Sequence, residues 1–86
     1  MIEIFFKATF LKQVNELEKD LVQEVFEKIE LFKERKNHKI LKVHKLHGKL
    51  SGRFSFSINY SFRIVFQYNE DGHAVFLDIG DHDLYK

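Results

Sequence analysis

The sequence has 86 residues, the length of one compact domain, and 44% of them are hydrophobic, so the chain can fill a core without cross-links. The absence of Cys excludes disulfides and thiolate metal sites and fits a reducing cytosol. The net charge of +1 hides an uneven distribution, because residues 33–53 contain eight basic residues and one acidic residue, Glu34. Such a basic block predicts contact with a polyanion, although a solvated helix end followed by a loop would look similar.

Hydrophobic periodicity predicts one strand and two helices in the first half of the chain. Residues 2–6 alternate as a strand does, and residues 10–19 have apolar side chains at helical spacing after Thr9, which can cap that helix. Asp20 followed by Gln23 resembles a capping box and predicts a second helix start. The apolar stripe of that helix, which we expect in the core, consists of Leu21, Val22, Val25, Phe26, Ile29 and Phe32.

The second half of the chain predicts three strands after a connecting segment, residues 37–52. Residues 54–58, 62–67 and 75–79 alternate in hydrophobicity, and Asn59-Tyr60 and the segment 69–72 separate them as hairpin turns. Strict alternation of the Phe residues assigns most of them to the core. The order β-α-α-β-β-β predicts an α+β fold, a single domain of residues 1–86 with two N-terminal helices packed on an antiparallel sheet.

Nothing in the sequence predicts a membrane protein. No apolar run is long enough to span a bilayer, and the N-terminal stretch lacks the pattern of a signal peptide. We therefore expect a cytoplasmic protein. His38, His44 and His47 do not have the spacing of a zinc site and lie among lysines that repel cations, so no metal is expected.

Three segments of the second half together resemble the RelE superfamily. The segments are His44-Lys45-Leu46-His47-Gly48 with Gly52 after it, Ser61-Phe62-Arg63-Ile64-Val65-Phe66, and Ile79-Gly80-Asp81-His82-Asp83-Leu84-Tyr85. They are similar to that family's Leu-x-Gly segment, its strand of aromatic-Arg-aliphatic-aliphatic-aromatic residues, and its terminal Gly-x-His with a following aromatic residue. The order of elements also matches the RelE fold. The terminal Gly-x-His is closer to the YafQ branch, and the strand arginine is closer to RelE itself.

The resemblance implies a toxin of a type II toxin–antitoxin module, an mRNA interferase that cleaves mRNA on the ribosome without a metal or another cofactor. It also implies an antitoxin protein as the partner that covers the concave face of the toxin. Two alternatives stay open. ParE toxins share the fold but inhibit gyrase by binding, and a weakened relic would bind an antitoxin without cutting RNA.

RNA is cut when its own 2′-hydroxyl attacks the adjacent phosphate, a reaction that needs two proton-transfer groups and a cation. The resemblance suggests His82 as a catalytic acid or base and Arg63 as the cation that binds the phosphate. It suggests His44 as the second proton-transfer group and Tyr85 as a residue that stacks on a base or orients the phosphate. The alternatives are turn contacts for the histidines, a disordered tail for Tyr85, and a salt bridge from Arg63 to Asp78.

Four basic residues are candidates for contacts with the RNA backbone, which give affinity without sequence selectivity. They are Lys42, Lys45, Lys49 and Arg53.

The sequence departs from the family pattern in one respect that bears on activity. Ser55, Ser57 and Ser61 occupy the region where RelE-like enzymes have lysines and YafQ-like enzymes have a His and an Asp. A hydroxyl cannot replace a base or a cation. Either His44, His82 and the loop lysines carry the reaction, or the nuclease is weak or inactive. The second possibility keeps open the hypotheses of a gyrase inhibitor and of a relic that only binds an antitoxin.

Overall fold

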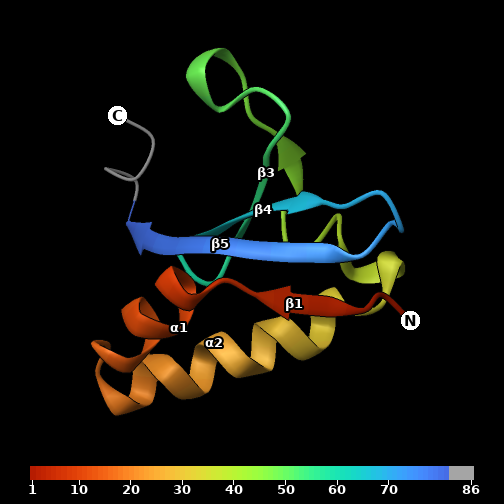
Figure 1. The fold of residues 1–86 in the computed structure, drawn as a ribbon. Helices are drawn as coiled ribbons and strands as arrows, with labels where there is room; N and C mark the ends of the chain where they lie inside the picture. Colours follow the sequence, from red (N-terminus) through yellow and green to blue (C-terminus); the bar gives the residue numbers. More distant parts are fainter. Residues whose placement is uncertain (82–86) are drawn as a thin grey trace.

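The computed structural model describes residues 1–81, in which two helices pack on one side of a mixed sheet (Figure 1). The helices are α1 (Ala8–Asn15) and α2 (Lys19–Phe32). The strands are β1 (Ile4–Phe6), β2 (His44–Lys45), β3 (Phe54–Ser57), β4 (Phe62–Tyr68) and β5 (Ala74–Asp81). Two short 3-10 turns, Arg35–Asn37 and Gly48–Leu50, lie in the connections. The predicted α+β class, with two N-terminal helices packed on a sheet, is confirmed.

The strands form one sheet in the order β1-β5-β4-β3-β2, and two of its features were not predicted. The β3–β4 and β4–β5 pairs are antiparallel, as expected for two hairpins, but β1 pairs with β5 in parallel. The two-residue strand β2 pairs with the start of β3, where the sequence predicted only a connection. The sheet therefore has one more strand than predicted, at the edge beside β3.

Helix α2 buries one stripe of side chains against the sheet, as its periodicity predicted. Val25, Ile29 and Phe32 are buried, at the spacing that places side chains on one helix face. Phe26 is an exception, because half of its surface is exposed. The predicted caps are also wrong. Neither helix has a side-chain cap bond, and the N-cap residues are Lys7 and Glu18, so Thr9 and Asp20 lie inside the first turns.

The core between helices and sheet is largely aromatic. Phe32 from α2 stacks on Phe56 with 4.7 Å between ring centroids and meets Phe66 and Phe76 edge-on. All four rings are essentially inaccessible to solvent. Offset and edge-on ring pairs add to the energy of apolar burial, so this cluster holds the helix layer on the sheet.

The free edge of β5 is covered by α1. β1 pairs with β5 only as far as Phe76, and the chain then leaves the sheet at Lys7, whose N–H donates to the Phe76 carbonyl at 3.0 Å. Beyond that point the Gln13 side chain replaces β1 as the partner of the β5 edge, because its Oε1 accepts a hydrogen bond from the Ile79 N–H at 2.8 Å. An unpaired strand edge invites pairing with another chain, and this contact closes it.

Neither helix within residues 1–81 is long and apolar enough to cross a membrane.

Candidate nucleic-acid interface

The face of the sheet opposite the helices contains the polar residues that the sequence singled out. Phe54, Phe56, Ile64 and Phe66 lie on the helix side, so the residues between them project to the other face. The strand register aligns two rows there. The first row is His44, Ser55, Val65 and Asp78, and the second is Ser57, Arg63 and Gly80.

Arg63 presents a guanidinium to this face without an acidic partner among residues 1–81. Its Nη1 donates to the Ser57 Oγ at 2.5 Å, across the β3–β4 pair. The alternative salt bridge to Asp78 is not formed, because the Asp78 carboxylate accepts instead from Gln13 Nε2 at 3.3 Å. A guanidinium has five N–H donors, so Arg63 retains donors for a phosphate while Ser57 fixes its direction.

His44 is oriented by the backbone of its own segment. The ring Nδ1 lies 2.8 Å from the Lys42 carbonyl oxygen, and a carbonyl can only accept a hydrogen bond. In the neutral ring the proton is therefore on Nδ1, which leaves the lone pair on Nε2. That nitrogen lies 3.4 Å from the Ser55 Oγ, a long contact that a substrate hydroxyl can replace. The arrangement suits a general base.

Lys42 has a backbone conformation that is unusual for its residue type. Its φ of 59° lies in the left-handed region, which costs a residue other than Gly about 1–3 kcal/mol. Its carbonyl is the group that accepts from His44. Strained residues of this kind concentrate at functional sites, where the surrounding structure holds them.

The three serines have different surroundings, which sequence reasoning did not distinguish. Ser55 is completely buried beside His44, and Ser57 bonds to Arg63. Ser61 lies in the β3–β4 turn, where its N–H donates to Asn59 Oδ1. Two of the three hydroxyls thus contact a candidate catalytic side chain. Ser55 and Ser57 are two residues apart on β3, about 6.6 Å, so both side chains lie on the same face of the strand.

The candidate basic residues are not all on this face. Arg53 lines a cavity of about 310 Å³ together with Lys7, Thr9, Leu77 and Asp78. Lys42 is exposed beside Arg63 in a second cavity. Lys45 alternates with His44 and so projects toward the opposite face, and Lys49 lies in the 3-10 turn before β3.

Lys7 is a basic residue of this region that the sequence analysis missed. It precedes α1, far from the basic block in the sequence, and only the parallel pairing of β1 with β5 brings it near Arg53. The sequence contains no signal for that pairing, because a three-residue strand has the same pattern beside either neighbour.

Two candidates, His82 and Tyr85, lie outside the described residues. Of the other histidines, His38 has a structural role, since it stacks on Phe32 and its Nε2 lies 2.8 Å from the Phe32 carbonyl oxygen. Over residues 1–81 no group of three His, Cys, Asp or Glu side chains is arranged to hold a metal ion.

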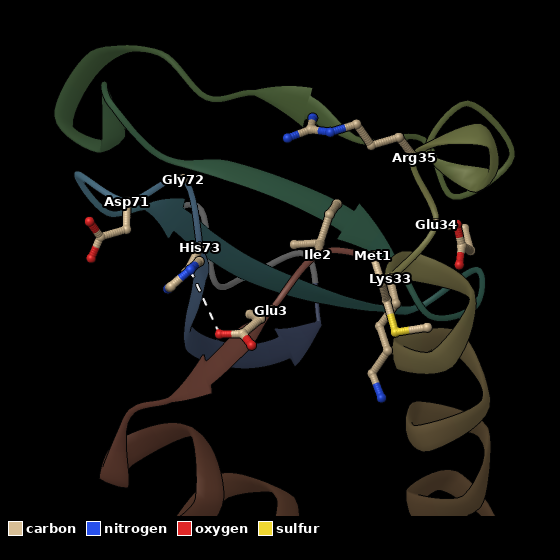
Figure 2. A pocket seen from close by; sticks show the side chains of 9 residues that line it. All are labelled: Met1, Ile2, Glu3, Lys33, Glu34, Arg35, Asp71, Gly72 and His73. Carbon is tan, nitrogen blue, oxygen red and sulfur yellow. Dashed lines mark ion pairs between the residues drawn. The ribbon is translucent and has the colours of Figure 1, made fainter.

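A cavity at the N-terminal edge is a weaker candidate for an anion. It measures about 460 Å³ and lies between the start of the chain, the end of α2 and the β4–β5 turn (Figure 2). Its lining mixes cations with the acids Glu3, Glu34 and Asp71. Figure 2 shows His73 directed at Glu3, with 3.7 Å between Nε2 and Oε2. These acids disfavour a polyanion there, whereas Arg63 forms no ion pair with an acid among residues 1–81.

Comparison with known proteins gives structural matches only. No protein-family model and no curated protein matches the chain. YafQ from E. coli superimposes with a TM-score of 0.79 at 14% identity over 100% of both chains. The archaeal RelE–RelB complex from Pyrococcus horikoshii matches with a TM-score of 0.72 at 15% identity, over 93% of each chain.

A third match is the YoeB–YefM complex from Staphylococcus aureus, with a TM-score of 0.71 at 21% identity, over 95% of this chain and 98% of the other. At these identities the matches establish the fold. The resemblance to the RelE superfamily that the sequence motifs predicted is therefore confirmed for the fold of the chain.

Proposed function

We propose that this chain is the toxin of a type II toxin–antitoxin module and that it cleaves mRNA on the ribosome in the cytoplasm. One observation carries the proposal. His44, with its lone pair on Nε2, and Arg63, with no acid paired to it among residues 1–81, share the sheet face that the helices leave open. The structural matches to RelE, YafQ and YoeB toxins support the same class of protein.

The proposed reaction is transesterification by the RNA itself. His44 Nε2 removes the proton of a ribose 2′-hydroxyl, and the resulting oxygen attacks the adjacent phosphorus. Arg63 donates to the non-bridging oxygens and stabilises the charge that develops on them. The bond to the 5′-oxygen breaks, and an acid protonates that oxygen. The products are a 2′,3′-cyclic phosphate and a 5′-hydroxyl end.

The sequence resemblance suggests His82 as the acid of this reaction, with Tyr85 assisting at the phosphate or the base. Both residues lie outside the described part of the chain. The serines do not act as acid or base. Ser55 and Ser57 position His44 and Arg63, so this chain replaces the strand lysines of RelE-like enzymes with an imidazole from the neighbouring strand β2.

An antitoxin is the proposed protein partner, because the archaeal RelE and the staphylococcal YoeB were solved as complexes with RelB and YefM. Arg63, which has no acid paired to it among residues 1–81, suits an acidic side chain of such a partner, which would exclude RNA from its guanidinium.

Inducible expression in a bacterium tests the proposal. Growth arrest with new mRNA ends is expected for the unchanged protein, and Arg63→Gln should abolish both. Arg35→Gln is the matched control, because Arg35 lies over the Tyr68 ring, away from the site. Normal growth in cells that contain folded, unchanged protein would refute the toxin assignment.

A gyrase inhibitor that acts by binding is the second candidate. The observation that favours it is the burial of Ser55 and the engagement of Ser57, which leave β3 without a base or a cation. This candidate predicts growth arrest with intact RNA and inhibited DNA supercoiling by purified gyrase. Undiminished supercoiling at saturating protein would exclude it.

A further inference from the structure

A groove adjoins Arg63 at the outer edge of β3, and the proposed reaction does not use it. The groove measures about 490 Å³. Its walls come from α2, from residues 40–42 and from the β3–β4 turn, and its lining includes Lys28, Ile40, Lys42, Tyr60 and Arg63. It is therefore continuous with the residue that is proposed to bind the scissile phosphate.

The charge of the groove is positive. Lys42 and Arg63 have no acidic partner within residues 1–81. Glu24, the acid in the lining, is already engaged, because it accepts from Asn59 Nδ2 at 2.7 Å and lies 4.0 Å from Lys28 Nζ. The charge left for a ligand is cationic and complements a phosphodiester backbone.

The rim of the groove is apolar and open. Tyr60 is 96% exposed and Ile40 is 78% exposed, and together with Met1 they are the three most exposed large hydrophobic residues in residues 1–81. An aromatic ring beside unpaired cations is the combination that single-stranded RNA binders use, since a base stacks on the ring while the cations hold the backbone.

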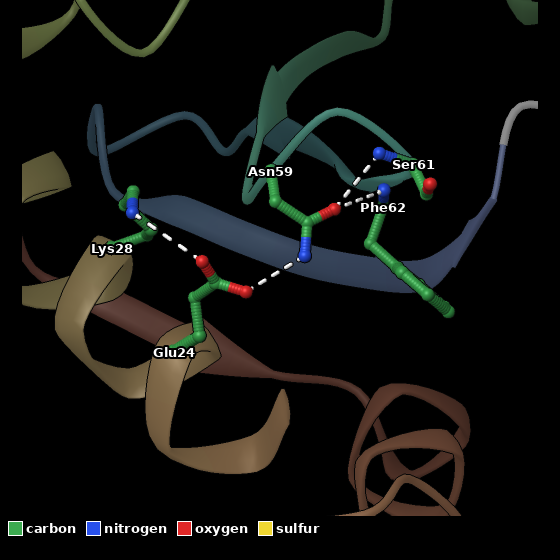
Figure 3. A network of polar contacts seen from close by, with 5 residues as sticks. All are labelled: Glu24, Lys28, Asn59, Ser61 and Phe62. Carbon is green, nitrogen blue, oxygen red and sulfur yellow. Dashed lines mark hydrogen bonds and ion pairs between the residues drawn. The ribbon is translucent and has the colours of Figure 1, made fainter. Parts of the chain in front are cut away.

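Tyr60 is carried by a turn that is held firmly. Asn59 Oδ1 accepts from the N–H groups of Ser61 and Phe62 at 2.8 and 2.9 Å, and Asn59 Nδ2 donates to Glu24 on α2. Figure 3 shows this network linking the turn to the helix. Because the backbone of the turn is already fixed, only the side-chain torsions of Tyr60 have to be ordered when a base stacks on its ring.

We propose that this groove binds the nucleotide next to the scissile phosphate, with its base stacked on Tyr60 and its backbone held by Lys42. The inference rests on the proposed RNA cleavage and adds Tyr60 to it as a substrate-binding residue. An RNA strand is favoured over a protein segment because the ring, Lys42 and the phosphate-binding Arg63 lie along one groove. A stable protein interface would instead need an apolar core larger than one ring and one isoleucine.

Kinetics of mRNA cleavage in a purified translation system test the inference. Tyr60→Ala should raise the KM by roughly 5- to 150-fold, the range for one lost base–aromatic stack. The kcat should stay near that of the unchanged protein, because the stack forms before the reaction and persists through it. Tyr60→Phe retains the ring and should behave as the unchanged protein does.

Phe26→Ala is the matched control, since Phe26 is a half-exposed aromatic residue on α2 that does not line this groove. Binding of a short fluorescein-labelled RNA with 2′-deoxy sugars, followed by anisotropy, should show the same ranking without cleavage. Tyr60 and Phe26 are exposed, so neither truncation should prevent folding, and circular dichroism checks this.

Each outcome decides between the two proposals. Cleavage by Tyr60→Ala at the unchanged KM would overturn the inference and leave the proposed nuclease standing. A Tyr60→Ala variant that cleaves normally but no longer binds the antitoxin would also overturn it and make the groove a protein-docking site. An unchanged protein that neither cuts nor binds RNA would refute the proposed function, and this inference with it.

Discussion

Removal of the His44 imidazole gives the sharpest test of the proposed chemistry. A positioned general base contributes about 10²- to 10⁴-fold to a rate, which corresponds to about 2.7–5.5 kcal/mol of barrier. The His44 Nδ1 is held by one hydrogen bond of 2.8 Å to the Lys42 carbonyl. The contact of its Nε2 with the Ser55 Oγ must break before Nε2 can accept a substrate proton. We therefore expect His44→Ala to lower the cleavage rate by about 10³-fold, the middle of that range.

The same substitution should barely change the free energy of unfolding. A lower cleavage rate can then be assigned to the missing imidazole and not to a loss of folded protein. His44 is exposed, and an exposed hydrogen bond contributes at most about 1 kcal/mol. His44→Asn is the more discriminating variant, because its amide can still donate to the Lys42 carbonyl but offers no base at the position of Nε2. It should lose as much activity as the alanine variant.

The assay is single-turnover mRNA cleavage in a purified translation system, with thermal unfolding measured on the same samples. His47→Ala is the control, an exposed histidine three residues along the same segment. The reasoning is refuted if His44→Asn cleaves within about tenfold of the unchanged protein, or if His47→Ala loses as much activity.

Three further predictions concern stability and are checked by thermal unfolding. Gln13→Ala leaves the Ile79 N–H without its acceptor and should cost about 1–3 kcal/mol; an unchanged melting temperature would contradict the role given to α1 at the edge of β5. Phe32→Ala should cost about 3–5 kcal/mol, because Phe32 is the centre of the aromatic cluster, whereas Phe26→Ala should cost far less. Lys42→Gly relieves the left-handed backbone and should gain roughly 1 kcal/mol, while RNA binding weakens; a destabilised glycine variant would argue against stored strain.

The sequence predicts the fold well where side-chain periodicity is long enough to be recognised. The alternating Phe residues of β3 and β4 identify both the strands and their buried face, and Arg63 lies between two core-facing residues of β4 and so on the opposite face. The turn at Asn59-Tyr60 follows from its composition, and the structure adds the bonds by which Asn59 holds it. These features are local, so a single sequence contains them.

Features that depend on tertiary neighbours could not be predicted. A two-residue strand shows no alternation, so the sequence could not predict the pairing of His44 with Ser55. The contact between the Ser55 hydroxyl and the His44 ring could not be predicted either. The alternative for Arg63 was a salt bridge to Asp78, but Gln13 reaches that carboxylate from a helix at the other end of the chain. The proximity of Lys7 to Arg53 likewise depends on the parallel pairing of β1.

The chemical identity of the RNA ends is the measurement that tests the central claim most directly. Total mRNA from cells or translation reactions that contain the unchanged protein would be analysed by mass spectrometry of the newly formed termini, with Arg63→Gln as the negative control. Attack by the 2′-hydroxyl predicts 2′,3′-cyclic phosphate and 5′-hydroxyl ends that are absent with the variant. Ends with a 3′-hydroxyl and a 5′-phosphate, or RNA that stays intact while growth stops, would contradict the account.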